Sequence, residues 1–252
     1  MYTQDDVRRV QNRLLQMAVA VRDILERHNI PHFIAYGTLL GAVRHRGFIP
    51  WDDDFDYYLF DDSYQQAMDV LAAELPADLF LENEKSEPLY FHGWAHVKDL
   101  KSVTECDLYP QDGCYSHHGI SLDLYRMKEM PSSQVDAYRR REYMDYLDRR
   151  KALHLIDEAD YERRTAQLRQ TEAGMTADRQ TSVRPVFATT LPGLEQIDRD
   201  EVFPLRKMAF EGTTFFAPRN PDTFLTLRYG SDYMQLPPVE QRVPHYSRVQ
   251  FL

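Results

Sequence analysis

The chain has 252 residues, with 30 Lys and Arg against 40 Asp and Glu, which gives a formal net charge of −10. Hydrophobic residues make up 43% and aromatic residues 12% of the sequence, enough to build a core, and this excludes a chain that is disordered throughout. The negative charge excludes a protein that binds nucleic acid through a broad basic surface, so an anionic ligand would need a local cation or a metal.

The cysteines and the start of the chain bear on its compartment. Cys106 and Cys114 are the only cysteines, too few for a disulfide framework and compatible with a reducing environment. Acidic residues come early and no apolar run follows them, unlike a signal peptide. No apolar stretch approaches the ~20 residues that cross a bilayer. We therefore expect a cytoplasmic protein without a transmembrane segment.

The predicted elements begin with a long helix. Apolar residues recur at helical spacing over residues 3–28, and Thr3 with Asp6 resembles a capping box. Downstream, aromatic and β-branched runs alternate with helical spacing and with Gly or Pro breaks. In chain order these patterns predict a strand at 32–36, a helical turn at 39–43, a strand in the later half of 51–60, a helix at 62–75, strands at 89–100 and 119–127, and one or two exposed helices at 131–170.

The remaining segments are rich in turn-forming residues or lie near the end of the chain. We interpret residues 104–118 as a surface excursion and 171–195 as a linker or long loop. A hairpin around 210–216, a short helix through Leu225 and Tyr229 and a Pro-containing tail follow. We find nothing in the charged helices at 131–170 that predicts a catalytic role.

A carboxylate cluster stands at the start of the strand in 51–60. Asp52, Asp54 and Asp56 are spaced by two, so an extended segment turns them to one face. Like charges this close need either full solvation or a divalent cation between them, and the spacing alone leaves both open.

Two further features favour the cation. Asp123 lies inside the apolar strand 120–125, where an unpaired charge would be costly. Gly37-Thr38 lies at a strand-to-helix turn, where backbone N–H groups can meet a phosphate. Together with the acidic cluster, they predict a metal site beside a phosphate site.

The segment 36–56 carries a specific resemblance. Its sequence, Tyr-Gly-Thr-Leu-Leu-Gly-Ala-Val-Arg-His-Arg-Gly-Phe-Ile-Pro-Trp-Asp-Asp-Asp-Phe-Asp, closely resembles the signature of the LicD family of phosphocholine transferases, whose relatives include fukutin and fukutin-related protein. The likeness continues at 97–99 with Thr104, at 119–125, at 210–212 and at 229–234 with Pro237 and Pro238.

The resemblance implies a fold and a domain organisation. We expect an α/β (α+β), nucleotidyltransferase-like mixed sheet with flanking helices and a helical insertion in the middle of the chain. The whole chain would form one transferase domain, with a catalytic core at 1–130, a helical segment and linker at 131–200, and a C-terminal segment at 201–252.

The resemblance also implies a reaction. A phosphocholine or a similar phospho-alcohol would move from a CDP-linked donor to a hydroxyl of a glycan or glycolipid, with Mg²⁺ or Mn²⁺ as cofactor. In the family's pattern Asp54 and Asp56 bind the metal and Asp123 is the third carboxylate. Asp123 is our candidate base, and Asp52 a candidate accessory ligand. The alternatives are nucleotidyl transfer from a nucleoside triphosphate and a noncatalytic glycan-binding protein.

Other residues of the signature and its surroundings are candidates for binding the donor. Some have a structural alternative: the arginines could pair with Asp52 or Asp53, the lysine could be an ordinary edge lysine, and the tryptophan could pack under Pro50. The candidates are Gly37, Thr38, Arg44, Arg46, Lys98 and Trp51. Near the end of the chain, Arg242 and His245 are candidates for a lid over the site, with a plain surface tail as the alternative.

A second constellation lies in the excursion at 104–118. Cys106, Cys114, His117 and His118 offer ligand types that zinc uses. Their spacing matches no standard zinc finger, so we expect a plain loop in preference to a structural zinc site.

Overall fold

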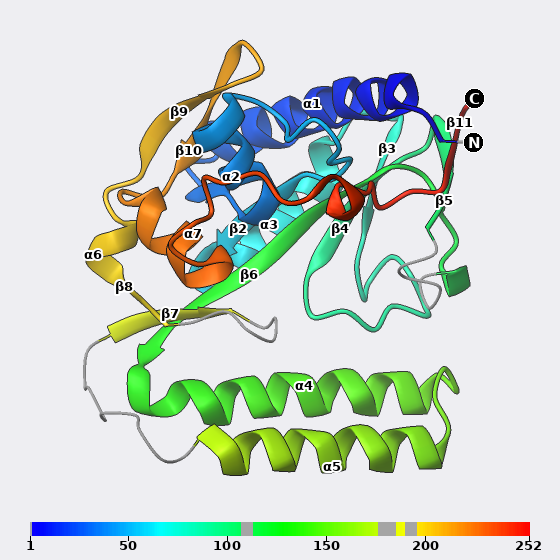
Figure 1. Ribbon diagram of the computed structural model, residues 1–252. Helices are drawn as coiled ribbons and strands as arrows, with labels where there is room; N and C mark the ends of the chain where they lie inside the picture. Colours follow the sequence, from blue (N-terminus) through cyan, green and yellow to red (C-terminus); the bar gives the residue numbers. More distant parts are fainter. Residues whose placement is uncertain (1, 107–112, 176–184, 190–195) are drawn as a thin grey trace.

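A mixed sheet forms the centre of the computed structural model, which describes residues 2–106, 113–175, 185–189 and 196–252 (Figure 1). Parallel β2 and β6 are its central pair, and the other strands add to it in antiparallel fashion. The main order is β1 (His32–Ile34), β2 (Asp56–Phe60), β6 (Ser121–Pro131), β4 (Ala95–Asp99) and β3 (Leu79–Glu82). This confirms the α/β class and the mixed sheet flanked by helices.

The long strand β6 has neighbours that change along its length. Its first half pairs with β2 on one side and β4 on the other. Its second half pairs with β7 (Pro185–Thr189), which in turn pairs with β8 (Ile197–Asp198). Residues at the start of β6 are therefore placed between two strands, which fixes where Asp123 lies.

Two helices pack together along the sheet. In α1 (Gln4–Arg27) the buried residues recur at three- and four-residue spacing, as the sequence predicts, and the helix contacts α3 (Asp61–Glu74) and β6. The capping box is confirmed, because the Asp6 N–H donates to Thr3 Oγ1 (3.2 Å) and the Thr3 N–H donates to Asp6 Oδ2 (3.0 Å). Leu14, Met17 and Val21 are fully buried on the inner face of α1.

The C-terminal part of the chain returns to the N-terminal part. Helix α2 (Tyr36–His45) contacts α7 (Pro221–Tyr229) and the hairpin strand β9. The hairpin consists of β9 (Arg206–Phe210) and β10 (Thr213–Ala217), and β10 contacts β1. A short helix α6 (Arg199–Val202) precedes it, and the 3-10 turn η3 (Val239–Gln241) lies in the tail.

The helical insertion lies apart from the other helices (Figure 1). After β6 and the turn η2 (Ser132–Gln134), α4 (Val135–Ala152) and α5 (Glu158–Met175) run as a helical hairpin. The base of α4 is fixed by Val135 and Tyr138, which share a small apolar cluster with Met130 and the β7 residues Val186 and Ala188. The hairpin therefore has a fixed position relative to the sheet.

Several strand predictions need correction. Of the strand expected at 89–100 only β4 is present, because Tyr90 and Phe91 turn into a separate aromatic cluster with Tyr115. Tyr36 begins α2 instead of ending β1. The sequence analysis missed β3, and it also missed β5 (Ser102–Glu105) and β11 (Arg248–Phe251), which pair with each other although they lie far apart in the sequence. Within the expected linker, β7 is a sheet strand, and 171–175 belong to α5. The rest of that linker, and 107–112 of the excursion, lie outside the described residues.

The main core lies between the sheet and its helices and is strongly aromatic. Phe33, Phe55, Tyr57, Phe210 and Phe215 are fully buried in it and meet mostly edge to face. Among the helices of the described residues, none is long and apolar enough to cross a membrane.

Candidate active site

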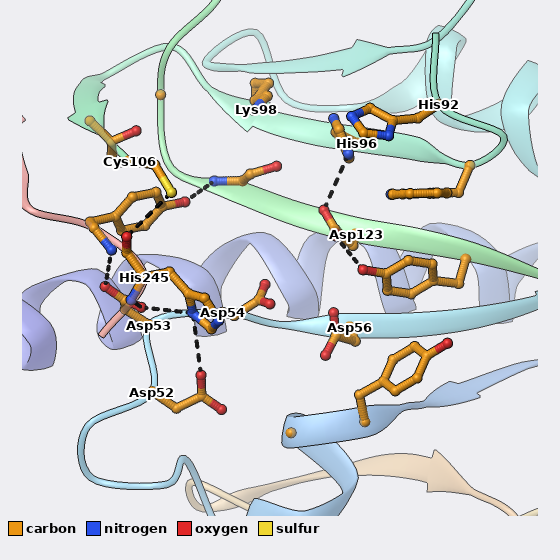
Figure 2. A pocket seen from close by; sticks show the side chains of 18 of the residues that line it. Asp52, Asp53, Asp54, Asp56, His92, His96, Lys98, Cys106, Asp123 and His245 are labelled. Atoms are coloured by element: carbon orange, nitrogen blue, oxygen red, sulfur yellow. Dashed lines mark hydrogen bonds and ion pairs between the residues drawn. The ribbon is translucent and has the colours of Figure 1, made fainter. Parts of the chain in front are cut away.

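A cavity of about 1020 Å³ opens beside the central strands β2, β6 and β4. The approach to β2 supplies residues 52–54 and 56, and the neighbouring strands supply side chains such as Lys98 and Asp123. The start of α2, residues of α4 and α5, the end of α7 and the C-terminal tail complete its lining. Figure 2 shows the acidic side chains gathered on one side of this cavity, with His92 and His96 across from Asp56.

Three carboxylates meet in the cavity. Asp56 and Asp123 are register partners on the parallel strands β2 and β6, and Asp54 lies two residues before Asp56 on the extended approach. One carboxylate oxygen from each of the three lies within 4.8 Å of the others. The spacing by two and the buried strand position thus bring together the three residues that the sequence singles out.

The electrostatics of the three carboxylates favour a cation. Burial raises the pKa of Asp54 to about 6, and the negative charge of Asp52 acts in the same direction, although nearby His245 opposes it. Burial and repulsion from Asp54 and Asp123 raise the pKa of Asp56 well above its ordinary value. Three carboxylate ligands, one buried and two half-buried, with excess negative charge fit Mg²⁺ or Mn²⁺, which prefer carboxylate oxygens.

A buried network supports Asp123. Tyr125 donates its hydroxyl to Asp123 Oδ2 (2.7 Å), and His96 Nε2 lies 3.6 Å from Asp123 Oδ1. The other ring nitrogen of His96 is 2.9 Å from Glu82 Oε2, and this glutamate is fully buried on β3. The sequence analysis missed His96 and Glu82, because only strand register brings them to Asp123. His96 on β4 is paired with Asp123 on β6, and Glu82 on β3 is paired with His96.

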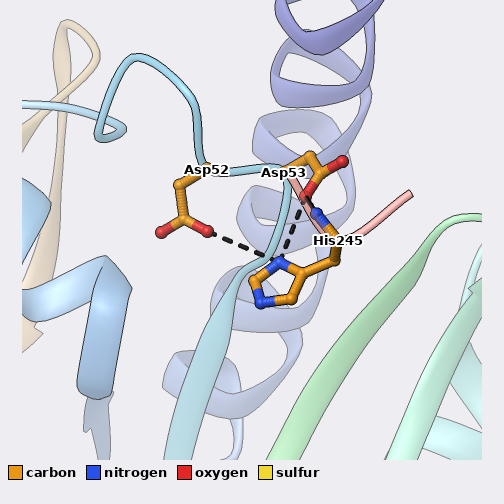
Figure 3. Close-up of side chains that lie close together, drawn as sticks. All are labelled: Asp52, Asp53 and His245. Atoms are coloured by element: carbon orange, nitrogen blue, oxygen red, sulfur yellow. Dashed lines mark hydrogen bonds and ion pairs between the residues drawn. The ribbon is translucent and has the colours of Figure 1, made fainter. Parts of the chain in front are cut away.

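Asp53 holds the C-terminal tail through His245, whose ring also lies close to Asp52 (Figure 3). Its Oδ1 accepts from the His245 N–H (2.7 Å) and lies 3.1 Å from His245 Nδ1, and its Oδ2 accepts from the Tyr246 N–H (3.1 Å). Asp52 Oδ1 lies 3.7 Å from the same ring nitrogen. The hydrogen bond to Asp53 and the surrounding carboxylates raise the pKa of His245 to about 9. The lid candidate His245 therefore lies over the acidic segment as a cation.

The start of α2 borders the cavity as expected, through Gly37. A Cβ at this position would lie 2.7 Å from Asp52 Oδ2, so only glycine allows the helix start and the acidic segment to approach this closely. Thr38 is buried, and its hydroxyl accepts from the Asp56 N–H (2.9 Å). Thr38 therefore positions Asp56 and is not part of the cavity lining.

The structure separates the expected cationic residues into two groups. Arg44 donates to the backbone carbonyls of Tyr233 (2.9 Å) and Gln235 (3.1 Å), and neither Arg44 nor Arg46 lines the cavity. Lys98 does line it, with Nζ 3.8 Å from Glu82 Oε2. Arg228 at the end of α7, which the sequence analysis did not select, also lines it and lies over the Tyr36 ring.

Aromatic side chains form much of the remaining lining. Trp51 is one of them, and the Arg242 guanidinium lies 5.0 Å from the centre of its ring, so Arg242 reaches the site through Trp51. The others include Trp94 on the approach to β4 and Tyr143 and Tyr146 on α4. Residues of the helices at 131–170, in which the sequence analysis found no catalytic signal, therefore form part of the cavity lining.

Comparisons with known proteins give the family of the segment that carries most of these residues. Residues 29–147 match the model of a family described as LicD/FKTN/FKRP, nucleotidyltransferase domain. The chain is 25% identical over 243 residues to the lipopolysaccharide cholinephosphotransferase LicD of Haemophilus influenzae, and the match covers 91% of each chain. Residues 29–147 therefore form a LicD-family domain. Two uncharacterized rickettsial proteins, from Rickettsia prowazekii and Rickettsia typhi, are 26% and 27% identical over about half of this chain.

The stretch that matches the LicD family contains most of the cavity. It includes the three converging carboxylates and extends into α4. Arg228, His245 and the rest of the tail lie beyond it and complete the site by folding back. The family-level resemblance is therefore confirmed, while the roles of single residues remain proposals.

The cysteines and histidines of the excursion do not converge on a common point. In the described residues, no three of Cys106, Cys114, His117 and His118 bring ligand atoms within 4.8 Å of one another. Cys106 Sγ donates to the His245 carbonyl (3.3 Å), and the His117 ring packs against Phe80. The geometry of the four side chains therefore offers no support for zinc.

Proposed function

We propose that the protein transfers phosphocholine, or a similar phospho-alcohol, from a CDP-activated donor to a hydroxyl of a glycan or glycolipid precursor. Asp54, Asp56 and Asp123 would hold Mg²⁺ or Mn²⁺. The observation that carries the proposal is the convergence of these three carboxylates in a large cavity. The LicD-family domain at 29–147 and similarity to a lipopolysaccharide cholinephosphotransferase support the class of reaction.

The chain's own groups suit this chemistry. A divalent cation held by the carboxylates would neutralise phosphate charge in the transition state. The first turn of α2 has no acidic residue and borders the cavity at Gly37, so the positive end of the helix dipole would favour an anionic phosphate there. Arg228 adds an exposed positive charge to the cavity lining.

Proton removal from the acceptor hydroxyl would fall to Asp123. This carboxylate has Tyr125 on one oxygen and His96 near the other, and the buried Glu82 fixes the orientation of the imidazole. A base needs a defined position close to the proton that it takes, and the network supplies that position. This arrangement supports Asp123 as the base in preference to Asp54. Asp54 Oδ1 already accepts a hydrogen bond from the Phe55 N–H (2.7 Å).

The released product tests the proposal. With CDP-choline, Mg²⁺ and a glycan acceptor, we expect the protein to release CMP, and we expect Asp56→Asn to lower the rate by about a hundred- to a thousandfold, a loss typical of removing transition-state charge stabilisation. Asp145→Asn, which removes one charge from an exposed position of α4, is the matched control. Full activity of Asp56→Asn would contradict the metal site. Release of pyrophosphate from a nucleoside triphosphate, with no CMP from any CDP-alcohol, would indicate nucleotidyl transfer.

A further inference from the structure

The segment that carries Asp54 belongs to neither a helix nor a strand. It covers residues 46–55, between the end of α2 and the start of β2, and we call it the approach loop. Its end is fixed by the sheet, because the Asp123 N–H donates to the Phe55 carbonyl (3.0 Å) and Asp56 begins β2. Asp54 comes before these bonds. Its position therefore depends on the contacts that hold the rest of the approach loop.

A buried glutamine of α1 holds the approach loop. Gln11 is 3% exposed, and its side-chain amide donates to the carbonyls of Ile49 (3.1 Å) and Asp52 (2.8 Å). These two bonds use both N–H donors of the amide. The Asp52 N–H in turn donates to the Ile49 carbonyl (2.9 Å), so Gln11 joins both ends of one turn. The backbone is thereby fixed two residues before Asp54.

Gln11 is itself held by an ion pair. Arg8 Nη1 donates to Gln11 Oε1 (3.2 Å), and Arg8 Nη2 donates to Glu211 Oε2 (2.8 Å) in the turn between β9 and β10. The other oxygen of Glu211 accepts from the Phe48 N–H of the approach loop (3.2 Å). A Cβ on Gly47 would lie 2.3 Å from that oxygen, so the close approach of Glu211 requires glycine there. Arg8 therefore connects two contacts that hold the same loop.

We propose that Gln11 is a positioning residue for the metal site, held in place by the pair of Arg8 and Glu211. Because it concerns the carboxylates that would bind the metal, this role of Gln11 rests on the proposed function. Gln11 and Glu211 do not line the cavity, and both lie outside the family match at 29–147. Mg²⁺ accepts only a narrow range of ligand distances and angles. A shift of the approach loop would therefore move Asp54 out of range while the strands keep the other two carboxylates in place.

Binding of Mn²⁺ to the whole protein, without any nucleotide, tests this role. Calorimetric titration gives the affinity for Mn²⁺. Gln11→Met keeps the length of the side chain but removes both donors, and it should weaken Mn²⁺ binding by about tenfold, a loss typical of removing a group that orients metal ligands. Gln11→Asn keeps the amide on a side chain one methylene shorter and should weaken Mn²⁺ binding in the same direction.

Val21→Ala is the matched control for lost stability. Val21 is fully buried on the same helix, ten residues after Gln11 and so about 15 Å further along α1. Its truncation should lower the free energy of unfolding through lost core packing and leave the affinity for Mn²⁺ unchanged. Urea denaturation of each variant measures the stability against which the Mn²⁺ affinities are compared.

The outcomes distinguish the role of Gln11 from the proposed function. Unchanged affinity for Mn²⁺ in Gln11→Met and Gln11→Asn would overturn the positioning role and leave the metal site intact. An equal loss of affinity in Val21→Ala would overturn it as well, because the loss would then follow stability. If the unaltered protein binds no Mn²⁺, the metal site of the proposed function fails, and the role of Gln11 fails with it.

Discussion

Asp54, Asp56 and Asp123 carry a cost that a metal would remove. Asp56 is buried and the other two are half-buried, and their charges repel one another, so loss of water and repulsion raise their pKa values. Sites organised for chemistry commonly sacrifice folding stability in this way. Without metal, the carboxylates therefore destabilise the fold that positions them.

This cost gives a testable stability difference. At pH 8 in the presence of a chelator, Asp54→Asn should raise the free energy of unfolding by about 1 kcal/mol, because it removes one charge from the group. The amide oxygen of Asn can still accept from the Phe55 N–H, so the local turn is kept. Urea denaturation measures the change, with Asp145→Asn as the control for removal of a charge elsewhere. A less stable Asp54→Asn protein would contradict the repulsion that we infer.

Residue types and spacing were sufficient to predict the carboxylates but not their neighbours. Spacing by two and a charge within an apolar strand single out Asp54, Asp56 and Asp123 from the sequence alone. His96 comes close to Asp123 only through strand register, and no local pattern encodes that register. Motif membership also does not distinguish a ligand-binding residue from a structural one, because Arg44 binds backbone carbonyls of another segment.

At the scale of elements, the tail depends on one buried side chain. Asp53 is 1% exposed and accepts the backbone N–H groups of His245 and Tyr246, and the strand β11 that follows pairs with β5. Short strands such as β11 and β5 were missed in the sequence because each is defined by a distant partner and has no strong periodicity of its own. Long, periodic elements such as α1 were predicted within a residue or two.

Removing Asp53 should therefore release the tail. In Asp53→Ala the two N–H groups lose their acceptor, which costs about 1–3 kcal/mol for each buried group left unsatisfied. We expect hydrogen exchange of residues 243–251 to become faster while the amides of α1 keep their protection. Mass spectrometry on peptides from both regions measures this. Unchanged exchange over 243–251 would show that other contacts hold the tail.

At the scale of the whole molecule, segments far apart in the sequence build one cavity. The start of α2, the acidic approach to β2, strands β4 and β6, the α4–α5 hairpin, α7 and the tail all contribute side chains to it. The sequence predicted the α/β class, because alternating patterns specify element types. It did not predict that α4 forms a wall, because its amphipathic pattern is weak and its position depends on the packing of Val135 and Tyr138 against β7.

The most direct test of the account is the melting temperature with CDP-choline in the presence of Mg²⁺ or of a chelator. A ligand that binds only the folded protein raises this temperature by mass action. We predict a rise of several degrees that needs both CDP-choline and Mg²⁺ and that is absent in Asp56→Asn. An equal rise in the chelator, or an equal rise in Asp56→Asn, would contradict the claim that Asp54, Asp56 and Asp123 bind metal and donor together.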